Sequence, residues 1–430
     1  MTHILPELFL CVRAMYVLFV PVATTCVRTY SAVSGTRRLY RGLRCMACLL
    51  DLRNSACVSS VLRVCMSGCT TALLLLHSTS HTHGSSEKGV PMRFLMLCRT
   101  AASMYMLRTD SLLSMYLCLE LRRLCRYVMT RREHQRAVEA RLKYLILGAF
   151  RSGLILLGMG LMYSTYGTVT WPAARIQDPM YNAGLARFCR GLFFKAGRRP
   201  FHYWVPDVYA GTPTLTRAYF ATVRKAGVLG LLASVPIPST LLWVVRVWSM
   251  LLGVLGAIPQ VNLKRMFRYS SIAQVGYMCL CLLGVQALGK TRMIYFMRIY
   301  MLSGLHRFGV FLHGFTTYAD LARNENRRLK FQVRLMFFSL AGIPPLLGFF
   351  AKARVLQYAW GVSEYILVFA ALLSSVIGVT YSLKVVVSLY TTSLNGPCIE
   401  KKASVPVSPI NRSLLCRSST LLASGWVLLL

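Results

Sequence analysis

Apolar blocks of membrane-spanning length recur along almost the whole chain, and they restrict its fold more than any other feature. A helix needs roughly twenty residues to cross a bilayer. Weaker apolar blocks lie near 38–52, 57–77 and 181–195. We therefore predict an all-α, polytopic transmembrane bundle of about 12–14 helices. The strong blocks are 4–26, 91–108, 111–129, 142–166, 214–236, 240–258, 266–288, 294–317, 332–352, 363–391 and 413–430.

Positive charge is in large excess. The chain has 50 lysines and arginines against 13 acidic residues, a net charge of +37, although 55% of its residues are hydrophobic. A basic chain often binds nucleic acid, but these arginines are scattered singly through apolar blocks. We therefore predict no nucleic-acid partner. Acidic neighbouring subunits and anionic lipids such as cardiolipin are expected instead, because arginines near helix ends reach the bilayer interface.

The 15 cysteines form no disulfide framework, and many lie inside apolar blocks. Reduced, buried thiols that pack like small hydrophobic residues are the expected state. Cys45 and Cys48 lack a second pair at metal-ligand spacing, so helix packing is the preferred interpretation. The histidines at 77, 81 and 83 lie in a Ser/Thr-rich run typical of a solvated connection. We predict no metal site.

Two apolar segments carry prolines shortly before a lysine. Pro213 precedes Lys225, and the pair Pro344 and Pro345 precedes Lys352. Interrupted helices in both halves of a chain are typical of inverted-repeat transport proteins, although ordinary kinked spans also tolerate proline. An ionisable group at the bilayer centre costs about 2.5–3.5 kcal/mol, so lysines kept there twice are expected to have a use.

This pattern predicts two inverted five-helix repeats containing broken helices. The expected parts are divergent N-terminal spans (1–90), a first antiporter-like half (91–236), a second half (237–392), and a C-terminal loop with the last span (393–430). The first apolar block has spanning length, so no cleavable targeting peptide is expected.

Glu120 is the one acidic residue deep inside a strongly apolar block. It is the natural partner for a buried lysine, because charged together the two groups offset part of their desolvation. Separated, each group has its neutral form favoured. Such a pair suits a proton relay. His202 follows Lys195 by seven residues and shares a face with it if the helix continues that far; an interfacial histidine is the equal alternative.

Four stretches carry a resemblance to a known family. They include "FKAGRRPFHYWVPDVYAGTPTLTRAYFATVRKAG", "QVNLKRMFRYSSIAQVGYMCLCLLG" and "FSLAGIPPLLGFFAKARVL". The fourth begins "DSLLSMYLCLELRRLCRYVMTRREHQ". Together they resemble the subunit 2 family of NADH dehydrogenase (ubiquinone), which lies in the membrane arm of respiratory complex I, and its bacterial and plastid relatives. The resemblance covers roughly residues 90–390.

The resemblance implies roles for the charged residues. It implies that Glu120 and Lys195 form a switchable ion pair, that Lys225 is the mid-membrane proton carrier, and that Lys352 is the outlet. Accessory relay positions are expected at three further residues. These are His202, His306 and Lys264.

The same resemblance implies a function. The chain is expected to translocate protons, coupled to quinone reduction, as one subunit of NADH:ubiquinone oxidoreductase. No glycine-rich dinucleotide loop or cysteine cluster is present, so cofactors are expected only in partner subunits. The expected location is the mitochondrial inner membrane, with a bacterial or plastid membrane as the second choice. A related cation/proton antiporter subunit and a non-pumping structural subunit are the alternatives.

Arginines stand where this family has small or neutral residues. If Arg123, one helical turn from Glu120, pairs with it, the Glu120–Lys195 switch would weaken. A second interpretation is that the arginines face neighbouring subunits or water-lined cavities. A third is transcript editing or an unusual genetic code, which peptide mass spectrometry over 118–130 would test. The arginines concerned are Arg122, Arg123, Arg126, Arg198, Arg199, Arg224 and Arg307.

Overall fold

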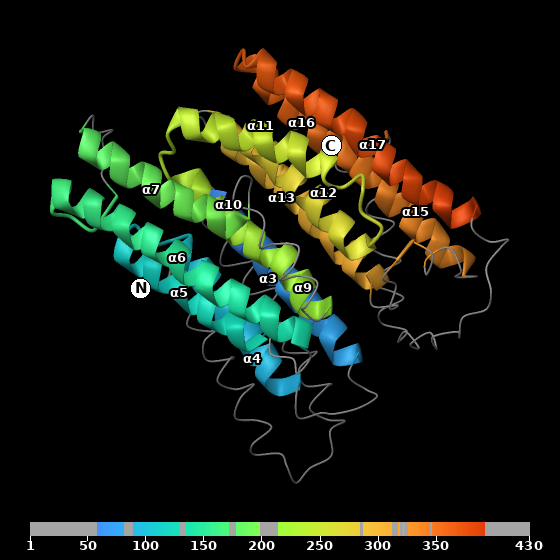
Figure 1. Ribbon diagram of the computed structural model, residues 1–430, viewed down its shortest axis with the longest axis horizontal. Helices are drawn as coiled ribbons and strands as arrows, with labels where there is room; N and C mark the ends of the chain where they lie inside the picture. The colour runs from blue at the N-terminus through green and yellow to red at the C-terminus, as the bar shows by residue number, and fades with distance from the viewer. Residues whose placement is uncertain are drawn as a thin grey trace, which may run out of the picture. The chain divides into compact units, whose positions relative to one another are not determined.

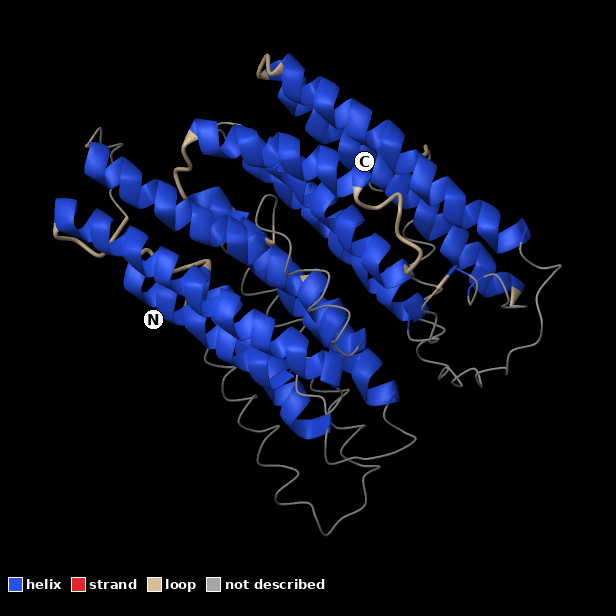
Figure 2. Cartoon of the chain, viewed as in Figure 1, coloured by secondary structure: helices blue, strands red, loops and turns tan. Residues whose placement is uncertain are grey.

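Helices make up the regular structure of the part of the chain that can be described (Figures 1 and 2). No strand occurs in that part; there are only isolated bridges between Ser111 and Thr170 and between Asn262 and Thr317. The all-α prediction is confirmed. The computed structural model describes residues 58–80, 89–129, 135–171, 178–197, 214–283, 287–311, 317–318, 321, 326–344 and 346–391.

The helices follow the apolar blocks closely. With the labels of Figure 1, they are α3 (Val58–Ser80), α4 (Gly89–Met106), α5 (Leu112–Met129), α6 (Gln135–Tyr166), α7 (Pro179–Ala196), α9 (Thr214–Ala221), α10 (Val223–Ser234), α11 (Ser239–Leu255), α12 (Leu263–Leu280), α13 (Ala287–Phe311), α15 (Arg327–Ala341), α16 (Leu347–Gly361) and α17 (Tyr365–Thr391). The predicted spans 4–26, 38–52 and 413–430 lie outside the described residues, as do Cys45 and Cys48.

The chain divides into two compact units. The first contains α3 to α6, α7 as far as Leu192, and α10. The second contains the end of α7, α9, and α11 to α17. The segment 193–222 therefore belongs to the second unit although it lies between two parts of the first.

Glycines bring helix backbones close together in the first unit. A Cβ on Gly158 of α6 would lie 2.6 Å from the backbone nitrogen of Phe188 on α7, and 2.8 Å from the carbonyl oxygen of Gly184. Small residues at such crossings are typical of membrane helices, which associate through backbone packing. The two glycines thus set how closely α6 and α7 approach.

A similar crossing joins α11 and α12 in the second unit. A Cβ on Gly253 would lie 2.7 Å from the backbone nitrogen of Ala273, and one on Gly276 would lie 2.7 Å from Oγ of Ser249. Helix α12 also contacts α13, α16 and α17. As a result, its side chains are buried along almost the whole helix.

The polarity of the bundle is opposite to that of a water-soluble protein. On α5, Leu117 is 59% exposed and Leu124 is 56% exposed, whereas Arg122 and Arg126 are each 1% exposed. An apolar exterior suits contact with lipid, and ionisable groups in membrane helices turn toward the bundle interior. The buried arginines are therefore an interior feature of each unit.

Two described helices are long and apolar enough to cross a bilayer by length and composition, at Leu145–Tyr166 and Tyr365–Tyr390. The other apolar blocks are interrupted by arginines or by helix ends. Of the chain's cysteines, the eight in the described part are not joined in disulfides, and six of them are buried.

Candidate functional site

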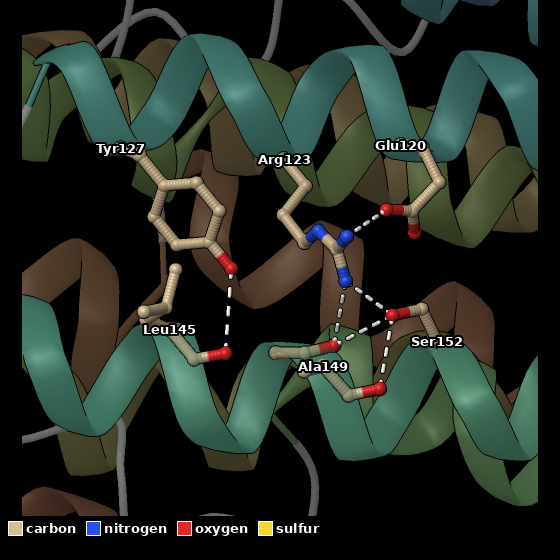
Figure 3. Close-up of polar contacts among 7 residues, drawn as sticks. Glu120, Arg123, Tyr127, Leu145, Ala149 and Ser152 are labelled. Atoms are coloured by element: carbon tan, nitrogen blue, oxygen red, sulfur yellow. Dashed lines mark hydrogen bonds and ion pairs between the residues drawn. The ribbon is translucent and has the colours of Figure 1, made fainter.

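Glu120 and Arg123 form an ion pair on α5. Nη2 of Arg123 lies 2.5 Å from Oε2 of Glu120, and the two side chains are 20% and 16% exposed. They are three residues apart, so they lie one helical turn from each other on the same face. Figure 3 shows the guanidinium lying between the carboxylate and the neighbouring helix α6. Glu120 therefore has a partner within its own helix.

Arg123 also links α5 to α6 through hydrogen bonds. Its Nη1 donates to the carbonyl oxygen of Gly148, at 3.1 Å, and to Oγ of Ser152. The Ser152 hydroxyl lies 3.0 Å from the carbonyl oxygens of both Gly148 and Ala149, so it donates to the backbone while it accepts from Arg123. The carboxylate is thus held through Arg123 to a neighbouring helix.

Gly148 makes room for this arrangement. A Cβ there would lie 2.7 Å from the Tyr127 hydroxyl oxygen and 3.3 Å from Nη2 of Arg151. Arg151 is 1% exposed, and its charge interacts with those of Glu120, Arg123 and Arg224. Glu120 thus interacts with the buried cation Arg151 as well as with Arg123.

Arg122 points to a different part of the first unit. Its Nη2 donates to the carbonyl oxygen of Arg224 at 3.2 Å, and its Nη1 lies 3.3 Å from the sulfur of Met106. A Cβ on Gly227 would lie 3.0 Å from Nη2 of Arg122, so a larger residue there would require the guanidinium to shift. Arg122 therefore places a fixed positive charge against the backbone next to Lys225.

Three of these unexpected arginines in the first unit do not face outward. Arg122 and Arg126 are each 1% exposed and Arg224 is 5% exposed. The interpretation that they face neighbouring subunits is therefore wrong for these three. Arg198 and Arg199 lie outside the described residues.

Lys225 lies one turn after a helix interruption. Helix α9 ends at Ala221, Thr222 is a turn residue, and α10 begins at Val223. The interruption nearest Lys225 is thus at Thr222 rather than at Pro213, which precedes the first residue of α9 and lies outside the described residues. Proline is well tolerated before a helix, because the first turn needs no amide donor from it.

Lys195 is buried near the end of α7, at 2% exposure. The helix ends at Ala196 because Gly197 takes a left-handed conformation, with φ of 69°. The condition for His202 to share a helical face with Lys195 is therefore not met, and His202 lies outside the described residues. Lys195 belongs to the second unit and Glu120 to the first, so their pairing stays a prediction.

Lys352 binds the end of a neighbouring helix. Its Nζ donates to the carbonyl oxygens of Leu340, at 3.0 Å, and Ala341, at 2.8 Å, the last two residues of α15. Gly342 ends that helix with φ of 87°. A Cβ on Gly342 would lie 3.2 Å from Nζ. The cation thus sits at the negative end of a helix dipole.

The interruption beside Lys352 spans the proline pair. Helix α15 ends at Ala341 and α16 begins at Leu347, with Pro344 exposed between them and Pro345 outside the described residues. The free carbonyls at this helix end are what a lysine ammonium needs as acceptors. The local sequence therefore creates the lysine's binding site.

Tyr277 of α12 forms the other wall of the Lys352 site. Nζ of Lys352 lies 5.7 Å from the centre of its ring, a distance suited to a cation–π contact. The Tyr277 hydroxyl lies 2.8 Å from the carbonyl oxygen of Ala371 and 2.6 Å from Oγ of Ser374. The ring is held by α17, so the position of Lys352 depends on four helices.

The remaining predicted relay residues lie on α12 and α13. His306 is fully buried, with Nε2 3.3 Å from the carbonyl oxygen of Gln332. Lys264 and Arg307 line a small cavity together with Arg268. The sequence offered no sign of Ser152 or Tyr277, because an isolated serine or tyrosine in an apolar block has no distinguishing spacing.

Replacing Lys352 by methionine should loosen the end of α15. The Leu340 and Ala341 carbonyls would each lose a charged donor, a contribution of about 1.5–3 kcal/mol per hydrogen bond. Amide exchange of residues 336–344 in the assembled protein is expected to accelerate. Lys330→Met is the matched control, because Lys330 donates to a single carbonyl, that of Leu389 at 3.2 Å. Equal effects of the two variants on 336–344 would contradict the assignment.

The buried lysines and interrupted helices define an antiporter-like membrane protein. A family model described as NADH:quinone oxidoreductase/Mrp antiporter, TM matches residues 109–378, which is more than half of the chain. Curated relatives of this chain are named more specifically, as NADH-quinone oxidoreductase subunit N. The chain belongs to the family of NADH-quinone oxidoreductase subunit N.

The relatives cover most of both chains. Subunit N 1 of Chloroherpeton thalassium is 34% identical over 322 residues, covering 69% of this chain and 68% of that protein. Subunit N of Hirschia baltica is 30% identical over 378 residues, covering 83% and 80%.

Solved structures show the same fold. A chain in respiratory complex I from Thermus thermophilus with bound aureothin has a TM-score of 0.83 and 26% identity, covering 99% of this chain and 97% of that one. A chain of the Mrp complex from Dietzia sp. DQ12-45-1b has a TM-score of 0.77 and 20% identity, covering 98% and 94%. The second similarity concerns the fold alone.

Proposed function

We propose that this chain is the counterpart of NADH dehydrogenase (ubiquinone) subunit 2 and translocates protons in a membrane-embedded NADH:quinone oxidoreductase. The observation that carries the proposal is the burial of lysines beside helix interruptions, Lys225 after Thr222 and Lys352 at the end of α15. Intramembrane ionisable groups mark proton paths. Because the chain belongs to the subunit N family, we propose that this path operates within an NADH:quinone oxidoreductase.

The proposed path uses four groups. Glu120 and Lys195 form a switchable pair, Lys225 carries the proton, and Lys352 releases it. His202, His306 and Lys264 are accessory positions. Moving one proton against the membrane potential requires about 2.3 kcal/mol per 100 mV, which quinone reduction elsewhere in the complex would supply.

Arg123 changes the first step of this proposed path, the pairing of Glu120 with Lys195. Because Arg123 already pairs with Glu120, the carboxylate would have to exchange one cation for another when it turns to Lys195. Such an exchange keeps the carboxylate ionised throughout, so Lys195 would carry the change in protonation. The proton relay would then begin effectively at the lysine.

The proposal extends to partners and location. We infer that redox cofactors lie in other subunits, that other membrane-arm subunits flank the chain, and that anionic lipids such as cardiolipin contact its basic surface. We place it in the mitochondrial inner membrane as a multi-pass protein, although the relatives reported above are bacterial.

A non-pumping structural subunit is the second candidate. The observation in its favour is the Glu120–Arg123 pair, which is hydrogen-bonded to α6. This pair would hinder the movement of Glu120 from Arg123 to Lys195. A cation/proton antiporter subunit shares the fold, but the subunit N relatives favour the oxidoreductase.

Isolation of the tagged chain would test the proposed assembly. Membranes would be extracted in mild detergent, and the chain purified by its tag. NADH:quinone reductase activity and proton uptake after reconstitution are expected to accompany it. Recovery of the chain without that activity, from membranes in which the activity is present, would defeat the assignment. Fractionation of the same cells would locate it.

A further inference from the structure

Two arginines interlock at the contact between α13 and α16 in the second unit. Nη1 of Arg292 on α13 donates to the carbonyl oxygen of Arg354 on α16, at 2.8 Å. The guanidinium carbon of Arg354 lies 4.2 Å from the ring centre of Tyr295 on α13. That of Arg292 lies 5.8 Å from the ring centre of Tyr358 on α16. Each arginine is therefore positioned by a tyrosine of the other helix.

These contacts leave most guanidinium N–H groups available. A cation–π contact uses no hydrogen-bond donor. The described part of the chain offers Arg354 no hydrogen-bond acceptor, yet none of its guanidinium nitrogens is buried. The same is true of Nε and Nη2 of Arg292. Two neighbouring helices thus present accessible, charged donors side by side.

No described acidic residue offsets these two charges. Glu364 is the one acidic residue of the second unit that the structure describes, and it forms no ion pair with Arg292 or Arg354. Lys290 adds a third positive charge within one helical turn of Arg292. An anion bound at the two guanidiniums would therefore reduce a net positive charge.

The arginine pair lies near one end of both helices. The start of α13 meets the end of α16, because a Cβ on Gly289 would lie 2.6 Å from the Tyr358 hydroxyl oxygen. At the rise of an α-helix, Arg292 lies about 8 Å from the start of α13 and Arg354 about 10 Å from the end of α16. Long basic side chains extend from such positions to the head-group level of a bilayer.

Exposed aromatic residues mark the same end of the unit. Trp360 and Tyr365 are 62% and 56% exposed, and their ring centres are 5.0 Å apart. Tryptophan and tyrosine are enriched where a membrane protein meets the lipid head groups. The arginine pair therefore lies close to the level at which phospholipid phosphates are found.

We propose that Arg292 and Arg354 together bind the phosphodiester group of an anionic phospholipid. Guanidinium forks match phosphate oxygens in geometry and charge, and two positioned forks lose little rotamer freedom on binding. A zwitterionic lipid also carries a phosphate, but its amine would be repelled by the net positive charge. The site gives a defined place to the anionic lipids proposed above as partners, and it rests on that part of the proposed function rather than on proton translocation.

Photo-labelling of the purified full complex would test the proposal. A phosphatidylglycerol analogue with a diazirine in its head group would be cross-linked by light, and labelled peptides quantified by mass spectrometry. Labelling of residues 287–311 and 347–361 is expected to fall about tenfold in Arg354→Gln, because charge-assisted hydrogen bonds are lost. It should be kept in Arg298→Gln, the matched control, since Arg298 is a single exposed arginine on α13.

Competition distinguishes the possible occupants of the site. Unlabelled phosphatidylglycerol and cardiolipin should reduce the labelling, and phosphatidylcholine should not. Equal competition by inorganic phosphate would show a site for free anions and would overturn the lipid assignment. Absence of labelling in the wild type would also overturn it, because a neighbouring subunit would then cover this face.

Arg354→Lys keeps the test decisive if Arg354→Gln fails to assemble. Lysine retains the charge and can keep a contact with the Tyr295 ring, but it lacks the planar fork, so labelling should again fall. Equal labelling of the wild type and of whichever variant assembles would contradict the proposal. NADH:quinone reductase activity is measured on the same samples, which separates failure of the lipid site from failure of the proposed function.

Discussion

Lys225→Met is expected to stop proton transfer through this subunit while the complex still assembles. A methionine cannot hold a proton, and loss of a positioned acid or base typically costs 10²-fold or more, so we expect a loss of about 100-fold or greater. Lys225 is 9% exposed, and methionine has a similar volume without a charge that must be desolvated. The measurement is the ratio of protons moved to electrons transferred in proteoliposomes.

Two further variants separate protonation from charge. Lys225→Arg keeps the positive charge but cannot release the proton, so it should be as defective as the methionine variant. Lys384→Met, at an exposed lysine on α17, should leave the ratio unchanged. Normal proton transfer in Lys225→Met would favour the structural role. Normal transfer in Lys225→Arg would show that charge alone is required.

The sequence predicted the helices well because the bilayer imposes a strict length on them. The blocks 111–129 and 363–391 became α5 and α17 with ends displaced by at most two residues. The block 332–352 was less accurate, because an apolar run cannot show that the chain leaves the helix between Ala341 and Leu347. Gly342, with its left-handed conformation, was the available signal.

The site was harder to predict because its geometry depends on packing between helices. The sequence identified Lys352 as a buried cation. It could not show that the acceptors of its ammonium group would be the backbone carbonyls of Leu340 and Ala341. The break predicted at Pro213 lies outside the described residues, and the structure has an interruption at Thr222 that the sequence did not predict. Thr222 explains this in part, since its hydroxyl bonds to the Ala218 carbonyl at 2.9 Å within the helix, a contact that often bends helices.

Glu120→Gln is expected to destabilise the first unit more than Arg123→Leu does. Among its acidic residues with described side chains, Asp110 and Asp178 are exposed, and Glu120 is the one that is partly buried. Removing its charge leaves Arg123 beside Arg151 without a described anion. Removing one partner of a fully buried pair typically costs about 3–5 kcal/mol, and because these two side chains are 20% and 16% exposed, we expect a smaller loss here. In Arg123→Leu, by contrast, the carboxyl group can take up a proton and become neutral.

The double variant distinguishes an ion pair from two independent residues. Glu120→Gln with Arg123→Leu leaves neither charge of the pair, so it should be more stable than Glu120→Gln alone, with a coupling energy of about 1–3 kcal/mol. Ser152→Ala is the matched control, because it removes one contact of Arg123 but keeps the pair. Stability would be followed by the melting temperature of the assembled complex and by retention of the chain. Additive losses would show that Glu120 and Arg123 act separately, and Glu120 would then be free to serve Lys195 alone.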